Sequence, residues 1–541
     1  MLHHNVTYQI VLRYKFFRFQ AITIILLAKT KNTRMAQAKI KTIISAAVIL
    51  STFASCNEKN TTSTQPLDPS VAMQFDTLKL TKGYKKVNEH NPIMVQRFGA
   101  DPYAMEYNGR VYVYMTNDVL EYDANNKVKE NTFGLINKIS CVSSDDLVNW
   151  TDHGAMQIAG KEEGAAKWAN FSWAPTACHK TIDGKEQFFL YFANSGNGIG
   201  VVTSETPFGP WTDPLGEPIV SRNTPTCSTV TWLFDPAVLV DDNGDGYLYV
   251  GGGVPDGKAA DPGTARVVKL ADNMIKLDGD PVAINPPYLF EDSGINKIGD
   301  TYYYSYCSNF NVPQGHIFGN GEICYMTSKN PMGPFVYAGR IFKNPGVFFG
   351  QWGNNHHAIC KLQDKYYLFY HAQNLRAEMG IDAGGYRNTN VNEVKINPDG
   401  SIGEVIGNKS GVKQLKNFNP FNQNEAETMA WMGGIKTRYI NSSTNLCVTA
   451  IDNGDWIGLS QVDFANGASK FSAKVATQTS GAIKICVNSV DGHCLGILPI
   501  NNTQGAFVDT QINLSETITG VHNLFFVFIG KFEFDSWTFI E

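Results

Sequence analysis

Residues 98–116 read FGADPYAMEYNGRVYVYMT: a short acidic start, an Asn-Gly turn, and a strand of alternating aromatic and aliphatic residues. Asn-Gly between two alternating segments is a strong β-hairpin signal, and the alternation is that of a half-buried strand. The same plan returns in four more segments, SWAPTACHKTIDGKEQFFLYF (172–192), FDPAVLVDDNGDGYLYV (234–250), LFEDSGINKIGDTYYYSYC (289–307) and NNHHAICKLQDKYYLFYH (354–371). One repeated unit therefore predicts an all-β region.

The five starts follow one another at intervals of 56 to 73 residues, each with room for four strands. A repeat of this length and content predicts the blades of a five-bladed β-propeller, which we place at residues 89–412. Because every blade points one strand end at the same axis, residues at the five starts should meet there. These anchor residues are Asp101, Ala174, Asp235, Glu291 and His356.

Composition excludes several classes of protein. The chain has 541 residues, 18% of them charged, and a formal net charge of −5. Without a basic stripe it is not expected to bind nucleic acid. None of its ten cysteines forms a CxxC pair, which argues against a zinc site or a thioredoxin-like motif. Buried free thiols, with one disulfide in the C-terminal part as the alternative, are the expected state.

The N-terminus predicts export. Residues 35–56, MAQAKIKTIISAAVILSTFASC, have a basic start, an apolar stretch and small residues before Cys56. This pattern resembles a bacterial lipoprotein signal, so residues 1–34 are interpreted as an over-extended start and Cys56 as the lipid-bearing residue and only membrane anchor. We expect an outer-membrane or cell-surface lipoprotein. The alternative is an ordinary cleaved signal, with a periplasmic or secreted protein.

Three further segments complete the predicted organisation. Residues 57–88 are polar at their start and are interpreted as a flexible tether. Residues 413–423 are interpreted as a linker. From residue 424 to residue 541 the strands are shorter and lack the acidic starts, which predicts a separate β-sandwich of jelly-roll type.

The acidic starts point to hydrolysis of a glycosidic bond. That reaction needs one carboxylic acid to protonate the leaving oxygen and one carboxylate to activate water or attack the sugar. A third carboxylate nearby raises the pKa of the acid. Asp101, Asp235 and Glu291 supply such a trio. Asp101 and Asp235 each precede a proline, so an extended backbone is expected at both.

These segments, together with GGYRNTNVNEVKINPDGSI (384–402), resemble the landmarks of glycoside hydrolase family 43, whose members are five-bladed propeller enzymes acting on arabinose- and xylose-containing polysaccharides. The resemblance implies Asp101 as general base, Glu291 as general acid, and Asp235 as the residue that raises the pKa of the general acid and orients it. It also implies single displacement with inversion. A related retaining clan uses Arg-Asp-Pro and Glu-Cys motifs, and neither stands at the corresponding places.

The same resemblance implies three secondary site residues. Trp173 would form an aromatic wall of the sugar pocket, with an inter-blade core position as the alternative. Arg387 would contact sugar hydroxyls, with a surface ion pair as the alternative. His356 would lie on the propeller axis beside a calcium ion, and hydrogen-bonded core histidines at 356 and 357 are the alternative.

The C-terminal part resembles carbohydrate-binding modules of family 6, β-sandwiches with a structural calcium. The resemblance implies Glu425, Glu427 and Asp535 as ligands of that ion. Sugar binding in the family uses two facing aromatics, but here Ala450 takes one position and Phe507 replaces the other. The module is therefore expected either to bind glycan elsewhere or to brace the propeller.

Within family 43 the Asn-Asn-His-His and Ala-Met-Glu-Tyr-Asn-Gly features and the appended module resemble members that remove α-L-arabinofuranosyl branches from arabinoxylan. We therefore expect a plant cell-wall polysaccharide as substrate. A β-xylosidase or an arabinanase on the same scaffold is the enzymatic alternative. A catalytically inactive surface glycan-binding lipoprotein is the alternative of another class.

Overall fold

The computed structural model describes residues 69–440 and 444–541, and their regular structure is almost entirely β-strand. The helices in these ranges are short: α3 (Pro69–Asp76), α4 (Gly346–Phe349) and α5 (Asn374–Glu378). The all-β prediction is confirmed. None of these helices has the length and apolar content needed to cross a bilayer. The predicted signal, Cys56 and the first part of the predicted tether lie outside the described residues.

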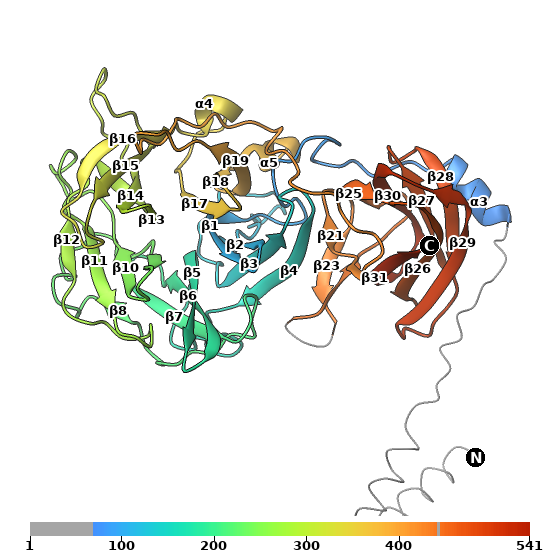
Figure 1. Cartoon of the computed structure of the whole chain (residues 1–541), viewed down its shortest axis with the longest axis horizontal. Helices are drawn as coiled ribbons and strands as arrows, with labels where there is room; N and C mark the ends of the chain where they lie inside the picture. The colour runs from blue at the N-terminus through green and yellow to red at the C-terminus, as the bar shows by residue number, and fades with distance from the viewer. Residues whose placement is uncertain (1–68, 441–443) are drawn as a thin grey trace, which may run out of the picture. The chain divides into compact units, whose positions relative to one another are not determined.

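Strands β1 to β19 form five consecutive antiparallel sheets, coloured blue to ochre in Figure 1 and named here the five-sheet region. The first sheet contains β1 (Ala100–Tyr107), β2 (Arg110–Thr116), β3 (Lys138–Ser144) and β4 (Trp150–Gln157). The second contains β5 (Trp173–Ile182), β6 (Lys185–Ala193), β7 (Gly198–Ser204) and β8 (Val220–Ser221). The third contains β9 (Ala237–Val240), β10 (Gly246–Val250), β11 (Ala265–Leu270) and β12 (Val282–Ile284). The fourth contains β13 (Leu289–Ile298), β14 (Thr301–Ser308), β15 (Ile323–Ser328) and β16 (Val336–Phe342). The fifth contains β17 (His357–Leu362), β18 (Lys365–Ala372) and β19 (Asn388–Val394).

The first strands of the five sheets contact one another in a ring. Strand β1 packs against β5, β5 against β9, β9 against β13, β13 against β17, and β17 against β1. Each neighbouring pair of sheets also shares a buried apolar core. Val113 of β2 and Phe369 of β18 lie in one such core, so the last sheet packs against the first. The alternating aromatic residues of the repeat thus serve mainly as inter-sheet packing.

Tight turns between the first two strands of the first and second sheets follow the sequence signals. Tyr107 pairs with Arg110 across Asn108-Gly109, and both turn residues have positive φ, 51° and 76°. This is the geometry that Asn-Gly favours in a two-residue hairpin loop. Asp183-Gly184 repeats it, with φ of 51° and 77°.

The remaining strands form two further sheets, named here the two-sheet region. One contains β23 (Lys436–Tyr439), β24 (Leu446–Thr449), β31 (Glu533–Ile540), β26 (Ala468–Ala476) and β29 (Val508–Ile518), with β20 (Asn424–Glu425) paired to β31. The other contains β22 (Trp431–Gly433), β25 (Trp456–Asp463), β30 (Val521–Gly530), β27 (Gly481–Val487) and β28 (His493–Ile500). Residues of both sheets, among them Phe471 and Phe526, share one core.

Two predicted boundaries differ from the structure. Strand β21 (Thr428–Met429), placed by prediction in a separate sandwich, pairs with β4 and extends the first sheet of the five-sheet region. Residues 69–88 are not a free tether. The Thr81 hydroxyl donates to Asp455 at 2.7 Å, and the Trp456 indole donates to the Thr81 carbonyl at 2.8 Å. These contacts join the segment to the two-sheet region, and polar composition alone did not reveal them.

A buried ionic network holds the two regions together. The Asp152 carboxylate on β4, 1% exposed, accepts hydrogen bonds from Gln96, from Arg97 at 2.7 Å and from the Thr437 hydroxyl at 2.7 Å. Burial raises the pKa of Asp152, but the Arg97 guanidinium outweighs it and brings the pKa to about 2. Because this pKa lies below the ordinary value, the pair stabilises the fold above about pH 4, and the stabilisation is lost as the pH falls toward 2.

We expect Arg97→Ala to lower the free energy of unfolding by about 3 kcal/mol at pH 7, because it leaves the Asp152 carboxylate buried without its cation. Urea denaturation followed by fluorescence measures the loss. Arg438→Ala is the matched control: it breaks an ion pair with Glu533 whose arginine is 43% exposed, and it should cost at most about 1 kcal/mol. Equal losses for the two variants would contradict the assignment.

Candidate active site

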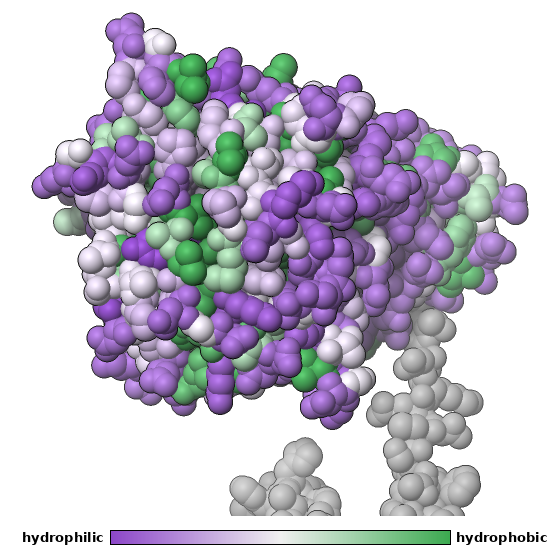
Figure 2. Space-filling view, turned by 60° about the vertical axis from the view of Figure 1, so that its left-hand side comes forward, coloured by the Kyte–Doolittle hydropathy of each residue, from purple (hydrophilic) through white to green (hydrophobic). Residues whose placement is uncertain are grey.

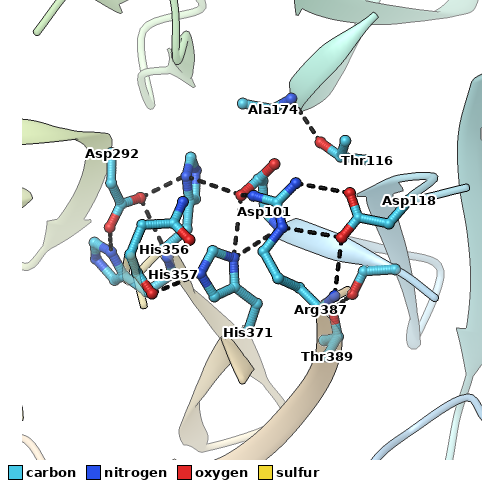
Figure 3. Close-up of polar contacts among 12 residues, drawn as sticks. Asp101, Thr116, Asp118, Ala174, Asp292, His356, His357, His371, Arg387 and Thr389 are labelled. Carbon is cyan, nitrogen blue, oxygen red and sulfur yellow. Dashed lines mark hydrogen bonds and ion pairs between the residues drawn. The ribbon is translucent and has the colours of Figure 1, made fainter. Parts of the chain in front are cut away.

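A pocket of about 130 Å³ opens where the first strands of the five sheets converge. It brings together all six residues predicted for the propeller site. The lining residues are Asp101, Phe133, Ile136, Trp173, Ala174, Phe234, Asp235, Glu291, Asn354, His356 and Arg387. The sheet starts therefore meet as the repeat predicted, and Figure 3 shows the polar contacts around Asp101.

The backbone at the sheet starts is not extended, contrary to prediction. Asp101, Ala174 and Asp235, each followed by proline, have φ of 45°, 40° and 46°. In β1 and β5 the strand register shifts at these positions, as in a β-bulge. Buried hydrogen bonds offset the strain: the Asp101 N–H lies 3.2 Å from His371 Nδ1, and the Ala174 N–H donates to the Thr116 hydroxyl at 2.7 Å. Tertiary bonding thus overrides the preference of the residue before proline.

Asp101 is held as a carboxylate by a buried cation. Arg387 Nη1 donates to Asp101 Oδ1 at 2.7 Å, and both side chains are nearly inaccessible. His371 Nδ1 lies 3.1 Å from the same oxygen. Burial raises the pKa of Asp101, but Arg387 and the two nearby histidines outweigh it and bring the pKa well below its usual range. A carboxylate ionised at all ordinary pH values can act as a base.

Arg387 itself is fixed by Asp118. Its Nη2 and Nε donate to the two Asp118 oxygens at 2.8 and 3.0 Å, and its backbone N–H donates to Asp118 Oδ2 at 2.9 Å. The Phe133 ring lies 5.0 Å from the guanidinium carbon. Arg387 was predicted to contact sugar hydroxyls. It does line the pocket, but the contacts seen here are with two carboxylates, in a bidentate arrangement that only arginine provides.

Glu291 has the opposite electrostatic environment. Burial, and then the negative charge of Asp101, raise the pKa of Glu291 to about 8. Within the described residues its Oε1 has no hydrogen-bond partner. Burial, and then Glu291 itself, raise the pKa of Asp235 well above its usual range. The pocket thus combines an ionised carboxylate with a carboxyl group that keeps its proton at neutral pH, the pairing that acid–base catalysis requires.

Asp292, next to Glu291, faces the surrounding frame rather than the pocket. Its Oδ1 accepts from the His357 backbone at 3.1 Å and lies 3.1 Å from His356 Nε2, and its Oδ2 lies 2.5 Å from His357 Nδ1. His357 Nε2 is 2.8 Å from the Ser305 hydroxyl. His357 thus matches the hydrogen-bonded core alternative.

His356 lies among three carboxylates. Its Nδ1 is 3.6 Å from Asp101 Oδ1 and 3.8 Å from Asp235 Oδ2, while its Nε2 faces Asp292. Both ring nitrogens therefore face carboxylate oxygens. Among residues 69–440 and 444–541, no group of three or more His, Cys, Asp or Glu side chains is arranged to hold a metal ion. An axial metal at His356 stays a prediction.

Aromatic rings form the walls of the pocket. Trp173 has its ring centre 5.3 Å from that of Phe171 and 6.4 Å from that of Phe133. On another side Phe234 packs edge to face against Trp232, with 5.4 Å between ring centres. Trp173 thus lines the pocket, and its contact with a sugar stays a prediction.

The predicted calcium ligands of the two-sheet region lie near one another. Burial raises the pKa of Glu427 well above its usual range, and Glu425 and Asp535 are among the charges that raise it further. Asp535 also lies 3.3 Å from Lys474. Among the described residues Glu427 Oε2 has no partner. A separate cavity of about 570 Å³ lies at Ala450, and Phe507 is not among its lining residues.

Sequence reasoning missed several residues of the site. Asp292 and Asn354 stand beside predicted residues, so the motifs Glu-Asp and Asn-Asn-His-His carried a signal for them. Phe234 stands in the Phe-Asp-Pro motif. Asp118 and His371 carried no local signal, because their contacts join positions about 270 residues apart.

Comparison with known proteins agrees with this geometry. Residues 89–402 match the model of Glycosyl hydrolases family 43, and residues 425–541 match that of Carbohydrate binding module (family 6). The chain is 48% identical to an arabinoxylan arabinofuranohydrolase of Bacillus subtilis, over 84% of this chain and 93% of that protein. It is also 48% identical to one of Paenibacillus polymyxa, over 83% and 74%.

A crystal structure of the Bacillus subtilis arabinoxylan arabinofuranohydrolase in complex with cellotetraose superposes with a TM-score of 0.83 at 47% identity, covering 85% of this chain and 99% of that one. Fold and site define a glycosidase. The chain belongs to glycoside hydrolase family 43 and carries a family 6 carbohydrate-binding module.

We expect the Glu291 carboxyl to be protonated at pH 6 and ionised at pH 10, with its midpoint near pH 8, because burial and Asp101 both favour its neutral form. Infrared difference spectroscopy of the carboxyl C=O stretch measures this titration. The band should be missing from Glu291→Gln, which serves as the assignment control. A Glu291 band that has already vanished at pH 6 would contradict the prediction.

Proposed function

We propose that this protein removes α-L-arabinofuranosyl side chains from arabinoxylan. The observation that carries the proposal is the pocket, in which an ionised Asp101 and a protonated Glu291 face one small space. About 130 Å³ is roughly four times the ~30 Å³ that one water occupies in the liquid. A space of this size is of the order of one small sugar ring. The two relatives at 48% identity, both arabinoxylan arabinofuranohydrolases, support the same substrate.

The roles follow from the charges. Asp101 activates water as general base, because Arg387 keeps it ionised. Glu291 protonates the leaving oxygen as general acid, because its pocket keeps the proton on it. Asp235 lines the pocket beside Glu291 and is proposed to orient the acid, and its own pKa is raised by burial and by Glu291. Water attacks once, on the face opposite the leaving group, so the anomeric configuration inverts.

A row of aromatic rings extends the site beyond the one-sugar pocket. From Phe234 at the pocket the row continues through Trp232 and Phe290 to Phe310, with 5.2 to 5.4 Å between successive ring centres. Phe310 is 41% exposed. Apolar side chains also gather in the middle of the face that comes forward in Figure 2, with polar ones around them. Aromatic faces beside a branch pocket suit the sugars of a polymer backbone.

The proposal also includes the fold type of the two regions. The closed ring of first strands and the shared inter-sheet cores support a five-bladed β-propeller for the five-sheet region. The two sheets around one core support a jelly-roll β-sandwich for the rest.

We also propose that Glu425, Glu427 and Asp535 hold a structural calcium ion. Carboxylate oxygens are donors of the kind calcium prefers, the charges of Glu425 and Asp535 act on Glu427, and Glu427 Oε2 has no partner among the described residues. The three side chains are not arranged as a metal-binding group in this structure, so calcium binding would require them to move together.

Incubated with arabinoxylan, the wild-type chain should release arabinose and no xylose, and the first-formed anomer should be inverted, as NMR of the fresh product will show. Asp101→Asn should lower kcat by about 10³-fold, because an amide cannot accept the proton from water. Release of xylose would favour a β-xylosidase. Unchanged turnover of Asp101→Asn would remove the proposed base.

Chelation should lower the thermal unfolding midpoint of the wild-type chain, and added calcium should restore it. An ion present at about 100 times its Kd stabilises a fold by about 2.7 kcal/mol. Glu427→Gln should lose this calcium response while keeping a folded structure, since the glutamine amide is neutral. Identical midpoints with and without chelator in the wild type would rule out the ion.

A further inference from the structure

We propose that Asp292 is a positioning residue for the general acid: it fixes three neighbouring sheet starts so that Glu291 and Asp235 face the leaving oxygen. This inference rests on the proposed function and extends it, because Asp292 neither lines the pocket nor belongs to the predicted acid–base trio.

The backbone of Asp292 ties the fourth sheet start to the third. Its N–H donates to Asp235 Oδ2 at 3.0 Å. Its φ is 69°, a conformation that aspartate adopts more readily than most residues. The register of β13 shifts between Leu289, Glu291 and Gly294, so Asp292 sits inside a bulge. The bulge lets consecutive carboxylates face different ways: Glu291 enters the pocket and Asp292 turns into the frame.

The side chain of Asp292 ties the fourth sheet start to the fifth. It is fully buried, and both of its oxygens are used by residues just before or at the start of β17. Oδ1 accepts the His357 backbone N–H and faces His356 Nε2, each at 3.1 Å, and Oδ2 faces His357 Nδ1 at 2.5 Å. Three contacts on one carboxyl group restrict its rotation.

The His357 ring, which contacts Asp292, is also held on its other side. His357 Nε2 lies 2.8 Å from the Ser305 hydroxyl on β14. A side chain at Gly294 would lie 2.4 Å from Ser305 Oγ and 3.1 Å from the His357 ring, so this glycine has no room to be replaced. Asp292 is therefore held from both sides, and a displacement of it would move Asp235 and Glu291 together.

Such a role has a kinetic signature that ordinary destabilisation lacks. Cleavage from xylan expels a sugar hydroxyl, which leaves only when an acid protonates it. Cleavage of 4-nitrophenyl α-L-arabinofuranoside expels a nitrophenolate, which leaves without a proton. A misplaced acid slows the first reaction far more than the second. The ratio of the two kcat values does not depend on the fraction of folded enzyme, because both scale with it.

The test compares wild type, Asp292→Asn, Ser305→Ala and Asp146→Asn on both substrates. Asp292→Asn keeps the size and the backbone preference but replaces one acceptor oxygen by a donor. We expect its kcat on arabinoxylan to fall by about 10²-fold with KM little changed, and its kcat on the nitrophenyl substrate to fall by less than about tenfold. Ser305→Ala breaks only the outer contact and should shift the ratio in the same direction by less. It decides the question if Asp292→Asn does not fold.

Asp146→Asn is the matched control, since Asp146 is equally buried and bonds Val148 and Asn149 in the loop between β3 and β4, away from the pocket. Its ratio should equal that of the wild type. Equal losses on both substrates for Asp292→Asn and Ser305→Ala would overturn the role of Asp292 while leaving the proposed function intact. A wild-type chain that releases no arabinose from either substrate would overturn the proposed function and this role with it.

Discussion

The buried ion pair between Arg387 and Asp101 is the interaction on which the rest of the site depends. Asp101, Asp118, Asp235, Glu291 and Asp292 are all nearly inaccessible, and burial alone would make every one of them neutral. Arg387 contacts only two of them, Asp101 and Asp118. Asp101 therefore keeps its charge, and that charge in turn raises the pKa of Glu291. One cation thus divides chemically similar groups into a base and an acid, because it hydrogen-bonds to Asp101 directly and acts on Glu291 only from a distance.

The division needs a frame that holds the groups apart, and the ring of first strands supplies it. Positive-φ backbone conformations at the sheet starts direct Asp101 and Asp235 into the pocket. Such conformations cost free energy and persist only where the surroundings fix them. Here the surroundings are hydrogen bonds from the same strained residues: the Asp101 N–H contacts His371, and the Asp292 N–H contacts Asp235. The same hydrogen bonds therefore maintain both the strained backbone and the positions of the catalytic side chains.

What could be predicted from the sequence was local or repeated. The Asn108-Gly109 hairpin and the convergence of Asp101, Asp235 and Glu291 on one pocket follow from turn chemistry and from the repeat. Asp118 could not be predicted, because its role is a contact with Arg387, which is 269 residues away in the sequence. The extended backbone expected at Asp101 was wrong, since the preference before proline is weaker than a buried bulge with its hydrogen bonds. The tether expected up to residue 88 was wrong for residues 69–88 because composition does not reveal partners such as Trp456.

The two-sheet region is attached close to the segment that carries the base, Asp101. Its contacts with the five-sheet region include the pairing of β21 with β4 of the first sheet, a hydrogen bond of 2.8 Å from the Trp431 indole to the Glu89 carbonyl, and a core shared with Leu375 and Tyr386. Arg97, bonded to Asp152 in this junction, precedes Asp101 by only four residues. A segment that short has little conformational freedom. The contacts of Arg97 at the junction therefore also restrain the backbone at the base, Asp101. Thr437 of the two-sheet region also donates to Asp152 in this junction, so the two-sheet region helps to hold the backbone segment that carries Asp101.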